Sequence, residues 1–197
     1  MIRKNLLKCN LIRNKFSAGS YFDSCMESFH PEQETCPYCK RTGDCRIHAY
    51  YDRHIVDFNR SRHEEHCIRI TRVICSCGHT HAILPDPIIP YKSYTLFFIL
   101  RVVLVFYRHR LTIRRLCDLF QISESTLYRW LSLYARHREE WQGLLLVRTV
   151  DTLSSLALLR RIEPFSRFAF FFIQKTGVSF LQSHKNPALC RRSTSPP

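Results

Sequence analysis

The stretch Leu111–Arg138, LTIRRLCDLFQISESTLYRWLSLYARHR, has the pattern of two helices separated by a short turn. In its first half Ile113, Leu116 and Phe120 recur every three or four positions, the period of one buried helix face. Ser123 follows a break in this period. It can cap a second helix, because its hydroxyl can accept a hydrogen bond from an unpaired N–H of the first turn. The stretch therefore predicts a helix-turn-helix.

The second helix of this pair has two chemically different faces. The apolar face would pack on the other helices and holds Leu127, Trp130, Leu131 and Tyr134. The opposite face is polar and holds Ser125, Tyr128, Arg129 and Ser132. The first two turns of such a helix normally enter the major groove of DNA. There Arg129 can donate two hydrogen bonds to a guanine edge, a contact that discriminates against other bases by about 1–3 kcal/mol.

The charge of the chain favours a nucleic-acid partner. It has 30 Lys and Arg against 16 Asp and Glu, a net charge of +14, and such an excess attracts a polyanion. We expect double-stranded DNA, bound through phosphate and base contacts. The candidate contact residues are Arg110, Arg114, Arg115, Ser125, Thr126, Tyr128, Arg129 and Arg136. A generic three-helix core with a solvated basic face is the alternative interpretation.

Two cysteine pairs precede the helical region. Cys36 and Cys39 form a Cys-x-x-Cys turn, whose thiolates can point at one centre. Cys75 and Cys77 form a second pair, followed by Gly78 where a turn needs positive φ. Between the pairs, CRIHAYY, HIVDF and HCIRITRVI are typical of short strands. The pattern predicts a zinc ribbon with one structural Zn²⁺ held by these four cysteines.

The fourth ligand has alternatives, because a single residue separates Cys75 from Cys77 where most ribbon turns have two. His79 and His81 follow directly and are alternates to Cys77. Lesser candidates are Cys45, His48, His63, His66 and Cys67. The rival interpretations of Cys36 and Cys39 are free thiols or a redox pair, but the strand–helix setting of a redox motif is not evident.

Neither export nor a membrane span is expected. The N-terminal residues are basic but develop no apolar signal-peptide core, which favours a reducing cytoplasm where cysteines bind metal or stay as thiols. The apolar run SYTLFFILRVVLVFY at 93–107 is too short for a bilayer span and is interrupted by Arg101. It predicts a buried helix that packs under the pair at 111–138.

These patterns predict an α+β fold class, with a small β-rich zinc ribbon followed by an all-α helix-turn-helix bundle and additional C-terminal helices. They divide the chain into a poorly ordered leader (1–35), the zinc ribbon (36–84), a proline-rich linker (85–92), the helix-turn-helix domain (93–141), C-terminal helices (142–183) and a disordered tail (184–197).

Four sequence blocks, together with the C-terminal segment, resemble a bacterial family of transposase-like proteins. The blocks are CPYCKRTGDCRIHAYYDR, CSCGHTHAILPD, IPYKSYTLFFILRVV and QISESTLYRWL, and the C-terminal segment is SFLQSHKNPALCRR. The resemblance covers about Cys36 to Arg192. Members of this family, which has no established activity, combine an N-terminal zinc ribbon with a helix-turn-helix and are common around mobile elements. The resemblance implies DNA binding within a transposition system.

No catalytic activity is expected. A complete transposase needs a carboxylate triad that holds two metal ions on an α/β domain. The acidic residues after Arg138 lie in a region too short and too helical for that domain: Glu139, Glu140, Asp151 and Glu163. We therefore expect a sequence-specific DNA-binding protein of a mobile-element system, with a homodimer or a separate transposase subunit as further candidate partners.

Two other functions remain open from the sequence. One is a zinc-dependent nuclease or hydrolase that uses the histidines His63, His66, His79 and His81. The other is a non-catalytic protein-assembly or membrane-surface factor that uses the apolar C-terminal half.

Overall fold

The α+β class is confirmed. In the computed structural model the described residues are 1–4, 18–27, 29–59, 62–85, 87–145, 153, 156 and 172–183. The elements in chain order are β1 (Ile2–Lys4), α1 (Ala18–Glu27), a 3₁₀ turn η2 (Pro31–Gln33), β2 (Cys45–Asn59), β3 (Arg62–Cys75), β4 (Thr80–Pro85), α2 (Leu96–Tyr107), α3 (Ile113–Phe120) and α4 (Glu124–Leu145).

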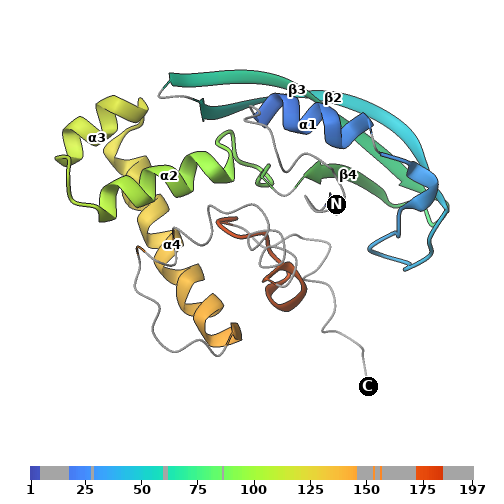
Figure 1. Cartoon of the computed structure of the whole chain (residues 1–197). Helices are drawn as coiled ribbons and strands as arrows, with labels where there is room; N and C mark the ends of the chain where they lie inside the picture. Colours follow the sequence, from blue (N-terminus) through green and yellow to red (C-terminus); the bar gives the residue numbers. More distant parts are fainter. Residues whose placement is uncertain are drawn as a thin grey trace.

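The sheet is mixed and has the order β1-β4-β3-β2. β1 pairs in parallel with β4, whereas β4–β3 and β3–β2 are antiparallel. The β2–β3 hairpin is long, with a register that runs from Cys45 opposite Cys75 to Asn59 opposite Arg62. Figure 1 shows this hairpin curving over the top of the molecule above α1, with α2, α3 and α4 gathered near its turn.

Two short strands were predicted at CRIHAYY and HIVDF, and this was wrong, because both belong to β2. The polar residue Asp52 separates the two apolar runs in sequence but pairs with Arg69 of β3 without breaking the ladder. The Arg69 Nε atom lies 3.4 Å from Asp52 Oδ1 on the exposed side of the hairpin. A charged cross-strand pair therefore lies within the strand, between the two segments that were predicted as separate strands.

The leader was expected to be poorly ordered, and its described parts correct this. Ile2 lies in β1 against β4, and α1 buries Phe22 and Cys25. Phe22 packs with Ile55 and Ile70 of the hairpin. The sequence did not indicate β1 and α1, because few apolar residues point inward here and the residues they pack against lie far along the chain. Residues 5–17 of the predicted leader lie outside the described residues.

The proline-rich segment was expected to be a stiff linker between two modules, and the structure instead buries it. Pro87 and Pro90 are buried, and so are Ile88, which packs in the Phe22 cluster, and Ile89, which packs in the helical core. The prolines prevent a helix as expected. The two isoleucines, however, are apolar enough to be drawn into both cores. The sheet and the helices are therefore joined through a packed segment.

The turn end of the hairpin docks directly on the start of α2. Val56 N donates to Ser93 O at 2.7 Å, and Thr95 N donates to Val56 O at 3.0 Å. The Thr95 hydroxyl donates to Asp57 Oδ1 at 2.9 Å and accepts from Phe98 N at 3.2 Å, which caps α2. A β2 carboxylate thus orients the cap of the first helix of the bundle.

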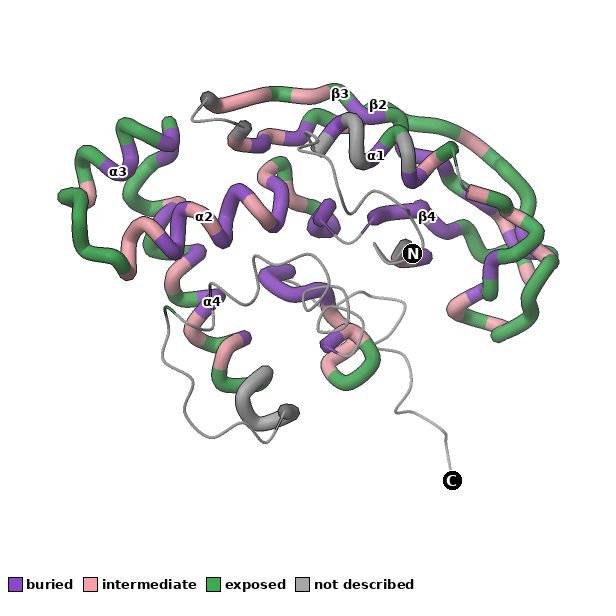
Figure 2. The backbone as a smooth tube through the Cα atoms, in the orientation of Figure 1, coloured by how far each residue is buried: buried purple, intermediate pink, exposed green. Residues whose placement is uncertain are grey.

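The helices form as the sequence predicted. Ser123 Oγ accepts a hydrogen bond from Thr126 N at 3.2 Å and so caps α4. α3 ends at Gln121 in the left-handed conformation, with φ 51°. Leu127, Trp130 and Tyr134 of the predicted apolar face are at most 1% exposed, and Cys117 is buried among them as a packing residue. Figure 2 shows buried positions along α2 and many exposed ones on α3.

The C-terminal part of the chain contributes a short packed segment. Phe172, Phe180 and Leu181 are buried in the helical core, and Leu181 N donates to His137 Nδ1 at 2.9 Å. Most of the predicted C-terminal helices (142–183) and the whole predicted tail (184–197) lie outside the described residues. Among the described helices, none combines the length and the apolar character that a bilayer span requires.

Candidate metal centre and helical surface

The first cysteine pair lies on a tight turn between η2 and β2. Lys40 N donates to Cys36 O at 2.9 Å, and Cys36 N donates to Arg41 O at the same distance. Lys40 takes a positive φ of 67° to close the turn. The turn brings the sulfurs of Cys36 and Cys39 to the same side of the backbone, as the Cys-x-x-Cys spacing predicted.

The second cysteine pair lies on the turn between β3 and β4. Gly78 N donates to Cys75 O at 2.9 Å, and Gly78 has φ 83°, a conformation that favours glycine. The two turns are tied together through Asp44. Its backbone oxygen accepts from Ser76 N at 3.1 Å, and its Oδ2 accepts from Ser76 Oγ at 2.9 Å. Arg41 Nη1 lies 3.2 Å from the same carboxylate oxygen.

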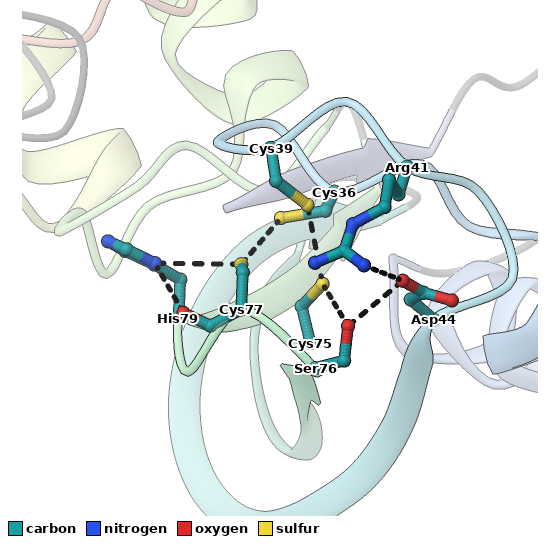
Figure 3. Close-up of polar contacts among 8 residues, drawn as sticks. All are labelled: Cys36, Cys39, Arg41, Asp44, Cys75, Ser76, Cys77 and His79. Carbon is teal, nitrogen blue, oxygen red and sulfur yellow. Dashed lines mark hydrogen bonds and ion pairs between the residues drawn. The ribbon is translucent and has the colours of Figure 1, made fainter.

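The four cysteine sulfurs meet in one cluster that can hold a metal ion. All four lie within 4.8 Å of one another. Cys36 Sγ is 3.7 Å from Cys77 Sγ, and Cys39 Sγ is 3.6 Å from Cys75 Sγ. With metal–sulfur bonds of about 2.3 Å, sulfurs at the corners of a tetrahedron lie about 3.8 Å apart. Figure 3 shows the two pairs approaching each other from opposite sides.

The single residue between Cys75 and Cys77 therefore does not keep Cys77 out of the cluster. Of the two alternates, His79 is exposed, and its Nδ1 lies 3.6 Å from Cys77 Sγ. His81 is buried, and its Nε2 lies 3.2 Å from Cys36 Sγ. Burial lowers the pKa of His81 to about 4, so the imidazole is neutral at pH 7. A neutral ring can donate from Nε2 to the Cys36 sulfur and hold it in place.

The electrostatics of the sulfurs also favour a cation. The backbone N–H of Arg41 lowers the pKa of Cys39 to about 6, and the backbone N–H of Cys77 lowers the pKa of Cys75. The His79 N–H acts in the same direction on Cys77, but burial and the neighbouring cysteines outweigh it and raise the pKa of Cys77 to about 12. Several thiolates cannot share this volume without a positive charge between them. A bound cation reverses that preference and deprotonates the remaining thiol.

The lesser ligand candidates do not join this cluster. Cys45 is buried beside it, with a pKa raised to about 11, first by burial. Cys67 is exposed. His63 lies near the turn end of the hairpin, where its ring centroid is 6.1 Å from that of Phe98. Cys75 lies twelve positions after His63 along β3, a distance of roughly 40 Å along the strand. The structure therefore separates His63 from His79 and His81, which the hydrolase interpretation would need to combine.

The predicted DNA contacts lie on the outer face of α3 and α4 and on the loop before them. The exposed ones are Arg110, Arg114, Arg115, Ser125, Tyr128, Arg129 and Arg136. Thr126 is partly buried, and its hydroxyl accepts from Ser123 Oγ at 3.0 Å and from Arg129 Nη2 at 3.5 Å. Thr126 thus belongs to the cap of α4 and orients Arg129.

Lys92 adds a positive charge that the sequence pattern did not reveal. The pKa of its ammonium group is lowered, first by burial and second by the charge of Arg129. This coupling places the segment before α2 near the N-terminal half of α4. The segment reaches that position because Tyr94 packs on Trp130, with ring centroids 4.9 Å apart. No local period in the sequence could show this contact.

Comparison with known protein families gives a match over about half of the chain. The chain is similar over residues 36–130 to a domain of unknown function (DUF6431). The matched region begins at the first cysteine of the cluster and ends at Trp130 in α4, so it contains both cysteine pairs, the long hairpin and most of the helical region. No curated protein and no solved structure matches the chain.

Proposed function

We propose that the protein is a zinc-containing, sequence-specific DNA-binding protein of a transposase-like mobile-element system, without a catalytic domain of its own. The observation that supports this most is the outer face of α3 and α4. It combines exposed arginines with short polar side chains over a core that holds both helices in place. In this proposal α3, the turn at 121–123 and α4 act as a helix-turn-helix, with α4 as the recognition helix.

Zinc is the metal that the cysteine cluster fits best. Four sulfur donors with tetrahedral spacing suit Zn²⁺, which has no redox chemistry of its own. With all four positions filled by sulfur, no position remains for a water or a substrate. The metal would therefore be structural and would fix the two turns that begin β2 and β4. This agrees with a protein that binds DNA and does not cut it.

The charge distribution supports phosphate contacts by the helices. Arg110, Arg114 and Arg115 surround the start of α3, and Arg136 lies further along α4. Each Arg that neutralises a phosphate releases condensed counterions, so binding should weaken steeply with salt. Arg129 lies in the first two turns of α4, where a side chain can reach a base edge. Affinity and specificity would then come from different residues of one surface.

The proposed setting is a cytoplasmic DNA complex. The partner is double-stranded DNA, and a homodimer or a separate transposase subunit would supply what this chain lacks for transposition. A dimer predicts a palindromic target with half-sites one or more helical turns apart.

The test is selection of bound duplexes from a random pool by the full-length protein, with the zinc content measured on the same sample. We expect an enriched sequence motif and about one zinc per chain. Retention of all sequences equally would contradict specific recognition, and a metal-free sample that still selects the motif would contradict the structural role of zinc.

A further inference from the structure

A cavity of about 510 Å³ opens beside the cysteine cluster. Its wall includes Tyr38 of the first turn, Tyr51 of β2, Arg72 of β3 and Tyr91 of the segment before α2. Met1 and residues 79–82 of the second turn and β4 complete it. Its size lies within the roughly 300–1,000 Å³ of pockets that hold small organic groups. The DNA surface proposed above, on α3 and α4, does not include this cavity.

Aromatic rings dominate the wall of this cavity, and they are open to solvent. Tyr38 is 60% exposed and Tyr91 is 70% exposed, so both rings are accessible to a ligand. His79 stacks on Tyr38 with ring centroids 3.5 Å apart and an interplanar angle of 20°. The stacked pair forms a flat, preorganised platform. Such a wall suits a flat ring system that can stack on it.

The charge of the cavity selects an anionic partner. Arg72 lies in the wall and donates to Thr80 Oγ1 at 3.0 Å, which leaves further guanidinium N–H groups for a ligand. The described lining residues include no carboxylate. A cationic ligand, such as a methylated lysine in an aromatic cage, would be repelled by Arg72.

We propose that this cavity binds an unpaired nucleotide of single-stranded nucleic acid, with the base stacked on the tyrosines and the phosphate held by Arg72. A base inside a duplex cannot use such a wall, because its neighbours cover both of its faces. The site therefore goes beyond duplex recognition by the helices. It does not depend on that recognition, since none of the predicted duplex contacts lines the cavity.

The experiment measures binding of the full-length, zinc-loaded protein to a fluorescein-labelled oligothymidylate of about ten nucleotides. Loss of one stacking ring weakens binding of a base by about tenfold, so Tyr51→Ala and Tyr91→Ala should each raise the Kd by this factor. Tyr91→Phe keeps the ring and should bind like the wild type. Arg72→Gln should weaken binding and make it less dependent on salt.

The matched control is Tyr50→Ala. Tyr50 precedes Tyr51 in β2, is 56% exposed and points to the opposite face of the hairpin. The substitution therefore removes an exposed tyrosine without changing the cavity. Its Kd for the oligomer should stay within about twofold of the wild-type value. Unchanged zinc content in every variant shows that the cysteine cluster is intact. Equal losses in Tyr50→Ala and Tyr51→Ala would overturn the assignment to the cavity.

Three further measurements test the chemistry of the site. An oligomer of abasic sugar phosphates has the same charge but no bases. Its Kd should be at least tenfold higher than that of oligothymidylate, because it lacks the stacking energy of at least one base. Equal binding would overturn the proposal, because only phosphate contacts would then be at work. Oligouridylate tests whether the natural strand is RNA or DNA, and tight cavity-dependent binding of either supports the site.

Arg114→Ala should weaken duplex binding and leave oligothymidylate binding unchanged, which separates this site from the helical surface.

Discussion

The two ends of the β2–β3 hairpin are stabilised by different interactions. At one end Cys36, Cys39, Cys75 and Cys77 face one another, backed by a small cluster that includes Ile2 and Val73. At the other end Val56 and Phe58 join a large apolar core from α2, α3 and α4. The first end has few apolar contacts, and its four cysteines are close enough to hold a metal ion, on which we expect this end to depend. The second depends on packed aromatic side chains, so the two ends should respond to different perturbations.

Removal of the metal should have the largest effect, and it should be confined to the cysteine end. Structural zinc sites contribute about 10–16 kcal/mol of apparent binding free energy, which is coupled to local folding. We expect chelation, or Cys36→Ser, to abolish backbone amide protection around the two turns while α2 keeps its protection. Hydrogen exchange measured along the chain makes this comparison. Uniform loss of protection in both regions would show that the two ends are one cooperative unit.

Trp130→Ala should affect the opposite end. Trp130 is 1% exposed and contacts the rings of Tyr94 and Phe98, so its truncation leaves a large cavity. We expect a loss of about 3–5 kcal/mol in the free energy of unfolding of the helical part, with unchanged zinc stoichiometry. Denaturant unfolding and metal analysis of the same variant check both statements. Loss of zinc in this variant would mean that the helical core also organises the cysteine cluster.

A fall in pH should destabilise the helical end through His137. Burial lowers the pKa of His137 to about 4, below the unfolded value of about 6.5, and its Nδ1 accepts a hydrogen bond from Leu181 N. As the pH falls, the unfolded chain therefore binds a proton at His137 at a higher pH than the folded chain does. The stabilisation is complete above pH 6.5 and is lost as the pH falls from about 6.5 to 4, by up to about 3 kcal/mol.

The check is the free energy of unfolding against pH for the wild type and for His137→Gln. A steeper fall in the wild type between about pH 6.5 and 4 is expected, because glutamine has no proton to bind there. Parallel curves would place the pKa of His137 in the folded protein close to its ordinary value.

Arg129→Ala should have a smaller effect, on recognition and not on stability. Arg129 is exposed, so its loss should change the free energy of unfolding by less than about 0.5 kcal/mol. Discrimination between bases at one position of the selected site should fall by about 1–3 kcal/mol. Arg110→Ala is the matched control, and it should lower affinity equally for all sequences. An unchanged base preference in the Arg129 variant would remove this side chain from the groove.

Local signals in the sequence predicted the elements that local chemistry determines. The Cys36–Cys39 turn follows from its spacing, and the Ser123 cap of α4 follows from one hydroxyl and the break before it. The predictions were wrong where contacts with residues far along the chain determine the structure. Asp52 lies within a strand because Arg69 pairs with it, and Ile88 and Ile89 are buried because two separate cores meet on them. The cavity wall was not foreseen either, since its tyrosines come from three unconnected segments.

The most direct test of the proposed function is the salt dependence of binding to the selected duplex. If the arginines of α3 and α4 contact phosphates, the logarithm of the binding constant falls linearly with the logarithm of salt concentration, with a slope of about −0.9 per phosphate neutralised. We expect a steep slope for the wild type, reduced by about 1 in Arg110→Ala. A slope near zero, or one that Arg110→Ala leaves unchanged, would contradict DNA binding by this surface.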